Sequence, residues 1–176
     1  MKTSGIKLFI SDIDGVWTDG GMYYDNGGNE WKKFNTADSA GVLFLRLLGI
    51  HFAIITGENT LIVQRRAEKL KVEHLFMGIT DKLKEAMDLC ERLDISLSEC
   101  AFIGDDLNDM KLLEQVGLSA CPANAPWYVK QKAHWELGVA GGNGAFRCFV
   151  EKYLEGTGQL EEAISLFHQS GKKAAQ

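Results

Sequence analysis

The chain alternates between short apolar runs and longer segments in which apolar residues recur every three or four positions. Each short run is rich in β-branched and aromatic residues, which is typical of a buried strand. The predicted strands cover residues 6–11, 51–56, 72–77, 100–104 and 118–122. The predicted helices cover residues 39–48, 59–70, 81–93, 108–116 and 145–154, with a last amphipathic helix on Leu160, Ala163, Ile164 and Phe167. This alternation predicts an α/β fold, a Rossmann-like parallel sheet with helices on both faces.

Residues 21–34 interrupt the alternation. Aromatic arms flank the turn sequence DNGG at positions 25–28, which is a strong β-hairpin signal. The large apolar residues of this segment are Met22, Tyr23, Tyr24, Trp31 and Phe34. A protruding hairpin this apolar needs a covering surface, which is either the core of its own chain or a partner.

Length and charge narrow the class of protein. The 176 residues fit one domain, residues 1–176, in which residues 156–176 form a C-terminal helical tail. A net charge of −5 and a pI near 5.4 argue against nucleic acid as the main partner. No apolar stretch approaches the ~20 residues needed to span a bilayer, so we expect no membrane partner. A cytoplasmic protein is the resulting expectation.

Cysteine and histidine give no metal signature. Cys90, Cys100, Cys121 and Cys148 lack metal-ligand spacing and are interpreted as reduced packing residues. The four histidines are scattered along the chain and suggest no metal cluster. The glycine-rich stretch 138–144 is the most flexible-looking segment.

Polar residues gather at the ends of the predicted strands. Asp12 and Asp14 follow the first strand, Thr56 and Gly57 follow the second, and the sequence GDDLND follows a later one at residues 104–109. Ligands of parallel sheets bind beyond the carboxyl ends of the strands. These side chains are therefore expected to converge, together with Lys82 at the start of a helix.

The carboxylates of this set suggest a metal ion. Asp12, Asp105 and either Asp106 or Asp109 would repel one another without a cation, because nearby like charges disfavour ionisation. Hard oxygen ligands suit Mg²⁺. The cofactor that the sequence predicts is therefore Mg²⁺.

The same residues suggest phosphoryl chemistry. The Thr56 hydroxyl, the Lys82 ammonium and nearby backbone amides, including that of Gly57, are able to cradle phosphoryl oxygens. Asp12 is a plausible nucleophile, because carboxylates attack phosphorus to form an aspartyl-phosphate. Asp14 beside it would serve as general acid to the leaving oxygen and then as base toward water.

In this order the motifs resemble those of the haloacid-dehalogenase superfamily: DIDG at 12–15, IITG at 54–57, Lys82, and GDDLND at 104–109. The resemblance implies that Asp12 is nucleophile and metal ligand, and that Asp14 gives its backbone carbonyl to the metal and its side chain to proton transfer. It implies that Thr56 and Lys82 hold phosphate and that Asp105 completes the metal ligands. Asp106 and Asp109 would support the loop.

Many members of that superfamily carry a cap domain, and this chain has no room for one. Only 41 residues lie between Asp14 and Thr56, and only 25 lie between Thr56 and Lys82. The hairpin sequence and GGNGAFR at 141–147 resemble the capless group that dephosphorylates 2-keto-3-deoxy sugar acid phosphates. The resemblance implies a homotetramer in which a neighbouring subunit completes each site. It covers the chain to about residue 155.

The expected substrate is a small sugar acid phosphate. Gly57, Glu58, Arg66 and Lys69 are the expected substrate-binding residues, and the resemblance implies that Arg66 reaches a substrate carboxylate, either in its own subunit or across an interface. Glu58 stands where the phosphatases of 3-deoxy-D-manno-octulosonate (KDO) 8-phosphate have glycine. With Lys69 it favours the nine-carbon KDN or N-acylneuraminate 9-phosphates, and KDO 8-phosphate is the alternative.

Two other functions use a similar pocket. Phosphoacceptor signalling domains also combine Asp, Thr, Lys and Mg²⁺ on a parallel sheet. Asp14 argues against that function, because it supplies the acid and base that a stable phospho-switch lacks. A phosphatase fold kept as a regulatory subunit is disfavoured because every motif residue is present.

Overall fold

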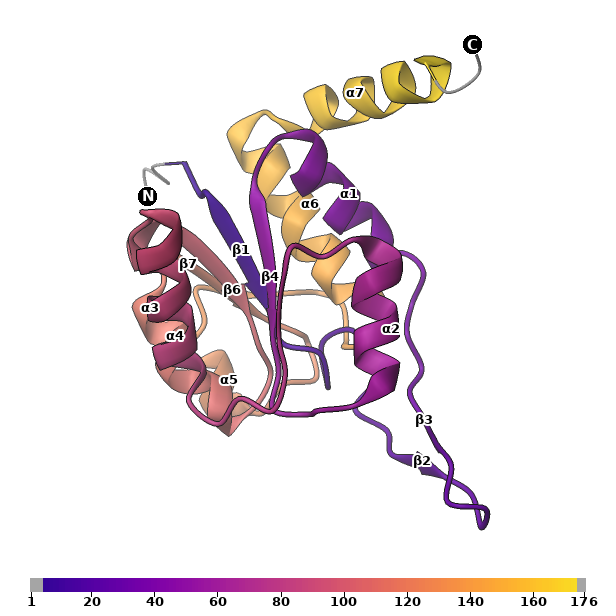
Figure 1. Ribbon diagram of the computed structural model, residues 1–176. Helices are drawn as coiled ribbons and strands as arrows, with labels where there is room; N and C mark the ends of the chain where they lie inside the picture. Colours follow the sequence, from indigo (N-terminus) through magenta and orange to yellow (C-terminus); the bar gives the residue numbers. More distant parts are fainter. Residues whose placement is uncertain (1–4, 174–176) are drawn as a thin grey trace.

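The computed structural model describes residues 5–173 and contains the predicted parallel sheet (Figure 1). Its six strands lie in the order β5-β4-β1-β6-β7-β8, and every neighbouring pair is parallel. Their bounds are β1 Leu8–Ser11, β4 His51–Ile55, β5 His74–Phe76, β6 Cys100–Ile103, β7 Leu118–Cys121 and β8 Trp135–Glu136. The predicted α/β class is confirmed.

Alternate residues of each strand enter two separate cores, as the pleat of a strand requires. Leu8 and Ile10 of β1 face one core, whereas Phe9 between them faces the other. The core on the Phe9 side is covered by helices α1 Asp38–Leu47, α2 Leu61–Leu70, α6 Ala145–Thr157 and α7 Leu160–Lys173. The other core is covered by α3 Lys82–Leu93, α4 Met110–Gln115 and α5 Trp127–Lys130. Helices therefore cover both faces of the sheet (Figure 1).

Several helix ends differ from the predicted bounds. Helix α2 begins after Thr60 and not after Asn59. Helix α3 agrees with its predicted range, and Asp81 caps it by accepting a hydrogen bond from the Lys84 amide at 3.1 Å. The predicted helix 108–116 divides into a 3-10 turn, Leu107–Asp109, and the short α4.

The structure adds two elements that sequence patterns did not predict, helix α5 and strand β8. Both are too short for a periodicity to be read. Strand β8 exists because it pairs with the edge of β7, where Trp135 lies opposite Ala120. Its stability is thus a tertiary property.

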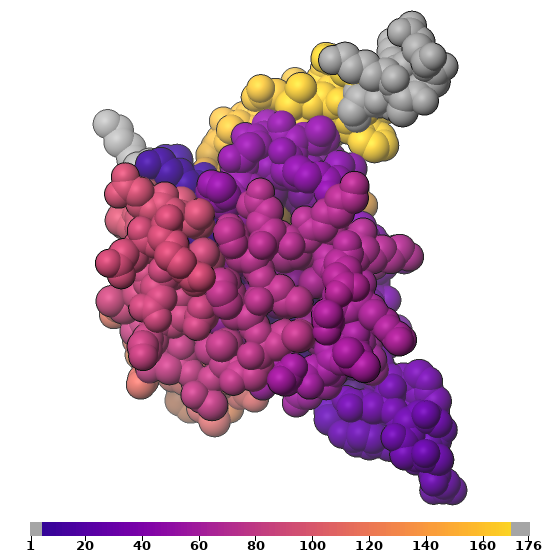
Figure 2. Space-filling model, viewed as in Figure 1, coloured from indigo at the N-terminus to yellow at the C-terminus, as the bar shows by residue number. Residues whose placement is uncertain are grey.

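The predicted hairpin forms and protrudes. Strands β2 Tyr23–Tyr24 and β3 Glu30–Trp31 pair antiparallel, and residues 21–34, here called the arm, project from the body (Figure 2). The arm leaves from the edge of the sheet at which the strands end, and α7 lies at the opposite end (Figure 1). Met22 and Tyr24 are 55% and 64% exposed, whereas Phe34 packs against the core, so only the base of the arm is covered by its own chain.

Only the arm and α1 separate β1 from β4, so the sheet edge carries no cap domain. The predicted tail consists of the end of α6 and helix α7, and its last residues, 174–176, lie outside the described part. Among residues 5–173, no helix is both long and apolar enough to cross a membrane.

Candidate active site

Three neighbouring strands bring the predicted residues together. Strand β1 lies between β4 and β6, so the residues that follow these strands, Asp12, Thr56 and Asp105, meet at one edge. Asp12, Asp14, Gly57, Glu58, Asp105 and Asp106 line one open cavity of about 300 Å³ at this edge. The convergence that the sequence predicted is therefore present.

Lys82 is the centre of the buried part of the site. Its Nζ lies 2.9 Å from Asp12 Oδ1 and 2.7 Å from Asp109 Oδ1, and its side chain is fully buried. Burial alone would lower the pKa of Lys82, but Asp12 and Asp109 together raise the pKa above its ordinary value. The ammonium thus stays charged even though it stands in the first turn of α3, where a cation is disfavoured.

Asp109 fixes the loop that follows β6. Its Oδ2 accepts hydrogen bonds from the backbone amides of Asp105 and Asp106, at 2.9 and 3.1 Å. A Cβ atom at Gly104 would lie 2.5 Å from Asp109 Cγ, so only glycine fits there. Asp106 is exposed and its Oδ1 accepts a hydrogen bond from the Leu107 amide. The loop sequence therefore serves to place Asp105.

The donor set fits a hard divalent cation. Ligand oxygens of Asp12, Asp105 and Asp109 all lie within 4.8 Å of one another. Both oxygens of Asp109 already accept hydrogen bonds, whereas Asp105 Oδ1 is buried without a hydrogen-bond partner in the described part of the chain. Asp12 and Asp105 are thus the carboxylates that are able to hold the ion.

The pKa shifts of Asp12 and Asp105 also support their assignment as the carboxylates that are able to hold the ion. Burial, and after it the charge of Asp109, raises the pKa of Asp12 to about 7. Burial, and after it the charges of Asp12 and Asp109, raises the pKa of Asp105 to about 8. A bound cation would stabilise the ionised forms of both groups and offset this cost.

Asp14 is held differently from Asp12. Both of its carboxylate oxygens accept from Nζ of Lys32, at 2.7 and 2.8 Å, and Oδ1 also accepts from the Thr18 hydroxyl at 3.2 Å. Lys32 lies in the arm and is not among the site residues predicted from the sequence. The pattern of the segment gave no sign that one of two adjacent lysines turns inward.

Thr56 precedes Gly57, which lines the cavity, but Thr56 and Lys82 are not themselves lining residues. The Thr56 side chain is buried, and its Oγ1 accepts a hydrogen bond from the Glu58 amide at 3.3 Å. The hydroxyl proton remains able to donate to a phosphoryl oxygen. Glu58 itself lines the cavity and is partly exposed, so its carboxylate is available to a ligand.

Arg66 and Lys69 do not line this cavity. The Arg66 guanidinium donates to the Asn35 carbonyl and to Ser39 Oγ, both at 3.1 Å, and lies over the Trp17 ring. Lys69 is exposed on the same helix. Within one subunit, the structure therefore does not bring these two residues to Asp12.

The stretch 138–144 was predicted to be flexible, and the structure instead packs it against the loop after β1. The Gly142 amide donates to the Val16 carbonyl at 3.0 Å. A Cβ atom at Gly141 would lie 1.8 Å from the Gly15 carbonyl oxygen. Glycine is needed here for close backbone approach, because a larger residue would displace the loop after β1, which carries Asp12 and Asp14.

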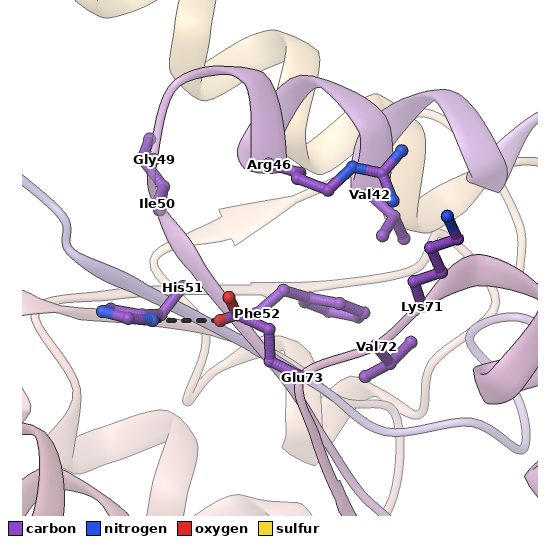
Figure 3. Close-up of a pocket in the computed structure, with 9 residues that line it drawn as sticks. All are labelled: Val42, Arg46, Gly49, Ile50, His51, Phe52, Lys71, Val72 and Glu73. Atoms are coloured by element: carbon purple, nitrogen blue, oxygen red, sulfur yellow. Dashed lines mark hydrogen bonds and ion pairs between the residues drawn. The ribbon is translucent and has the colours of Figure 1, made fainter.

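A second pocket lies at the opposite edge of the sheet, beside His51 and Glu73 (Figure 3). The scattered histidines were not expected to cluster, but His51 and His74 begin the adjacent strands β4 and β5. Their ring nitrogens and a Glu73 oxygen lie within 4.8 Å of one another. His51 and Glu73 are paired at 3.0 Å and largely exposed. We assign this cluster no part in the chemistry at the other edge.

The geometry defines a class of protein, an α/β protein with a Rossmann-like parallel sheet whose strand ends bring carboxylates able to hold a metal ion beside a buried lysine. Residues 75–147 match the family model of haloacid dehalogenase-like hydrolases. The chain is 39% identical over 162 residues to the 3-deoxy-D-manno-octulosonate 8-phosphate phosphatase KdsC of Escherichia coli K12, covering 92% of this chain and 86% of the relative.

Solved structures support the same family assignment. The 3-deoxy-D-manno-octulosonate 8-phosphate phosphatase of Moraxella catarrhalis, in complex with magnesium, phosphate and KDO, aligns with a TM-score of 0.89 at 37% identity, covering 94% of this chain and 95% of that one. The enzyme of the same name from Yersinia pestis gives 0.87 at 38% identity, covering 90% and 86%. The chain therefore belongs to the haloacid dehalogenase-like hydrolases, in the capless group that contains these phosphatases. The predicted class, a phosphomonoester hydrolase, is confirmed.

Proposed function

We propose that the protein is a Mg²⁺-dependent phosphatase that hydrolyses the terminal phosphate of a 2-keto-3-deoxy sugar acid phosphate. The observation that carries the proposal is the placement of Asp12, which lies against the Lys82 ammonium and shares one open cavity with Asp14 and Asp105. A nucleophile, a proton-transfer group and a metal ligand are thus within reach of one phosphoryl group.

The reaction begins with attack of an Asp12 carboxylate oxygen on phosphorus. The bond from phosphorus to the sugar oxygen breaks as the aspartyl-phosphate forms, and Asp14 gives a proton to the departing oxygen. Asp14 then takes a proton from water, which attacks phosphorus and releases phosphate and free Asp12. The two carboxylates have separate roles because their surroundings differ, Asp12 being buried and Asp14 partly exposed.

Charge stabilisation supplies much of the rate enhancement in phosphoryl transfer. Lys82 and the Thr56 hydroxyl hold phosphoryl oxygens, which positions the phosphorus atom against Asp12. Asp12, Asp105 and the backbone carbonyl of Asp14 would hold Mg²⁺. When bound, the ion neutralises charge on the transferring group. Asp109 and Asp106 support this arrangement through the loop.

For the substrate, we infer a nine-carbon KDN or N-acylneuraminate 9-phosphate. Glu58 lines the same cavity as Asp12 and Asp14, next to Gly57, and its carboxylate is able to accept hydrogen bonds from sugar hydroxyls. KDO 8-phosphate is the second candidate, because it is the substrate in the names of the relatives that align along most of the chain.

We further propose a cytoplasmic homotetramer that acts on a small molecule, with neither nucleic acid nor membrane as partner. The exposed apolar arm supports assembly, and the free thiols fit a reducing compartment. In this assembly Arg66 and Lys69 would serve the site of a neighbouring subunit, Arg66 by binding the substrate carboxylate. Arg66 would then exchange its contacts with Asn35 and Ser39.

The test measures phosphate release with Mg²⁺ from KDN 9-phosphate and KDO 8-phosphate in parallel. We expect kcat/KM to favour the nine-carbon ester by tenfold or more, which is ~1.4 kcal/mol of transition-state binding. Glu58→Gly should remove most of that preference, because the carboxylate that accepts sugar hydroxyls is lost. Glu68→Gly, on an exposed position of α2, is the control.

A preference for KDO 8-phosphate would contradict the role given to Glu58 and leave the phosphatase proposal in place. Release of phosphate from neither ester would contradict the sugar acid substrate.

A further inference from the structure

One lysine of the arm, Lys32, is buried and contacts the candidate active site. The side chain of Lys32 is 3% exposed, although its neighbours Trp31 and Lys33 are largely exposed. An ammonium withdrawn from water is costly unless it is paired. Both oxygens of Asp14 accept from Lys32 Nζ, at 2.7 and 2.8 Å, and Glu30 lies 4.0 Å away.

Each of the two catalytic carboxylates therefore has its own lysine. Lys82 holds Asp12 from the core, and Lys32 holds Asp14 from the arm. A partly buried ion pair of this kind is weak support for stability, because desolvation offsets much of the attraction. The ion pair between Lys32 and Asp14 does fix the orientation of the Asp14 carboxylate, because a carboxylate that is held through both oxygens cannot rotate freely.

The second contact of Asp14 comes from its own loop. Thr18 is buried, and its hydroxyl donates to Asp14 Oδ1 at 3.2 Å while accepting from the Gly15 and Gly20 amides. Thr18 thus fixes one oxygen relative to the loop. Only Lys32 contacts the other oxygen among the described residues, so the arm completes the orientation.

We propose that Lys32 is a positioning residue, which holds the Asp14 carboxylate in the orientation that gives the proton to the leaving oxygen. The inference rests on the proposed phosphatase function. It also connects the arm to the chemistry, because Lys32 follows β3 directly. A partner that covers the outer side of the arm would thereby also set the position of Asp14.

The proposal predicts that replacing Lys32 lowers kcat/KM by a factor that depends on the leaving group of the substrate. A sugar alkoxide leaves only with a proton, whereas 4-nitrophenolate leaves without one. kcat/KM reports the steps up to formation of the phosphoenzyme, which include departure of the leaving group. General acid catalysis is worth about 10²–10⁴-fold, and a positioning residue should carry part of that factor.

The experiment compares Lys32→Met with Lys33→Met, using the sugar acid phosphate and 4-nitrophenyl phosphate as substrates. Lys33 is the matched control, because it is exposed and its ammonium pairs with Asp19 at 3.5 Å and not with Asp14. For Lys32→Met we expect kcat/KM to fall about 10- to 100-fold on the sugar ester and less than about threefold on the aryl ester. In the Asp14→Asn background, Lys32→Met should cause no further selective loss.

Three results would overturn the inference. Equal losses on the two esters would mean that Lys32 binds the phosphoryl group. Unchanged kinetics would mean that its contact with Asp14 is structural only. A selective loss that persists in the Asp14→Asn background would mean that Lys32 does not act through Asp14. Thermal unfolding and light scattering show whether each variant is folded and assembled. If the wild-type enzyme is inactive on both esters, the result contradicts the proposed function as well.

Discussion

At the scale of single residues, burial separates two chemically identical groups. Asp12 is almost fully buried, and its surroundings raise its pKa to about 7, whereas the side chain of Asp14, which lines the same cavity, is 31% exposed. A nucleophile needs a fixed position, and a proton-transfer group needs access to the leaving oxygen and to water. The burial of the two aspartates fits these two requirements.

Replacing Asp12 should abolish catalysis without unfolding the protein. Asp12→Asn keeps the size of the side chain but removes the nucleophile, so kcat should fall by at least about 10⁴-fold. The fold should persist, because the lost carboxylate is one whose ionisation the surroundings disfavour. Phosphate release and thermal unfolding measure the two effects.

Asp88→Asn, on an exposed position of α3, is the control and should change neither quantity. Turnover near the wild-type rate in Asp12→Asn would rule out the covalent mechanism.

At the scale of elements, a glycine segment next to α6 shapes the catalytic loop. The backbone of Gly141 and Gly142 lies against the loop that carries Asp14 and Gly15. Gly15 in turn lies so close to Asp105 that a Cβ atom there would be 1.9 Å from its Oδ2. Residues about 125 positions apart therefore form one rigid support for the metal-binding edge.

Gly141→Ala should disturb that support. The added methyl group would meet the Gly15 carbonyl, so we expect a stability loss of about 1–3 kcal/mol and a fall in kcat of about 100-fold from displacement of the loop. Thermal unfolding and steady-state kinetics measure these two effects.

Gly138→Ala in the same segment is the matched control. No atom lies within 4 Å of its added methyl group, and it should behave as wild type. Equal behaviour of the two variants would mean that the loop adapts to the methyl group.

At the scale of the whole molecule, the arm is the feature that calls for a partner. A two-stranded hairpin is marginally stable on its own, and Tyr23, Tyr24 and Trp31 of this one are 41%, 64% and 50% exposed. The open cavity of the site lies at the end of the sheet from which the arm extends (Figure 1). Assembly through the arm would cover both the exposed aromatic side chains and the open site.

Light scattering should therefore give a tetramer for the wild-type protein. The double variant Tyr24→Ser and Trp31→Ser should give smaller species with reduced activity, because aromatic anchors in interfaces are commonly worth about 2 kcal/mol or more. Trp127→Ser is the control, since Trp127 is 70% exposed and lies outside the arm. A fully active monomer would contradict the proposed assembly.

Much of the fold and of the site could be predicted from the sequence. Strand and helix order followed from periodicity, and the edge at which Asp12, Thr56 and Asp105 meet followed from the rule for parallel sheets. Strand β8 and helix α5 could not be predicted, because their short sequences hold a defined structure only through pairing and packing with distant residues.

The sequence by itself determined the chemistry of this protein. Hydrophobic periodicity sets the elements, and the types and order of Asp12, Asp14, Thr56, Lys82 and Asp105 set what their edge of the sheet is able to do. Only the tertiary structure decided the direction of Lys32, the close approach of Gly141 and the place of Arg66 away from the cavity. These features depend on the relative position of segments far apart in the chain, which packing fixes and local patterns do not encode.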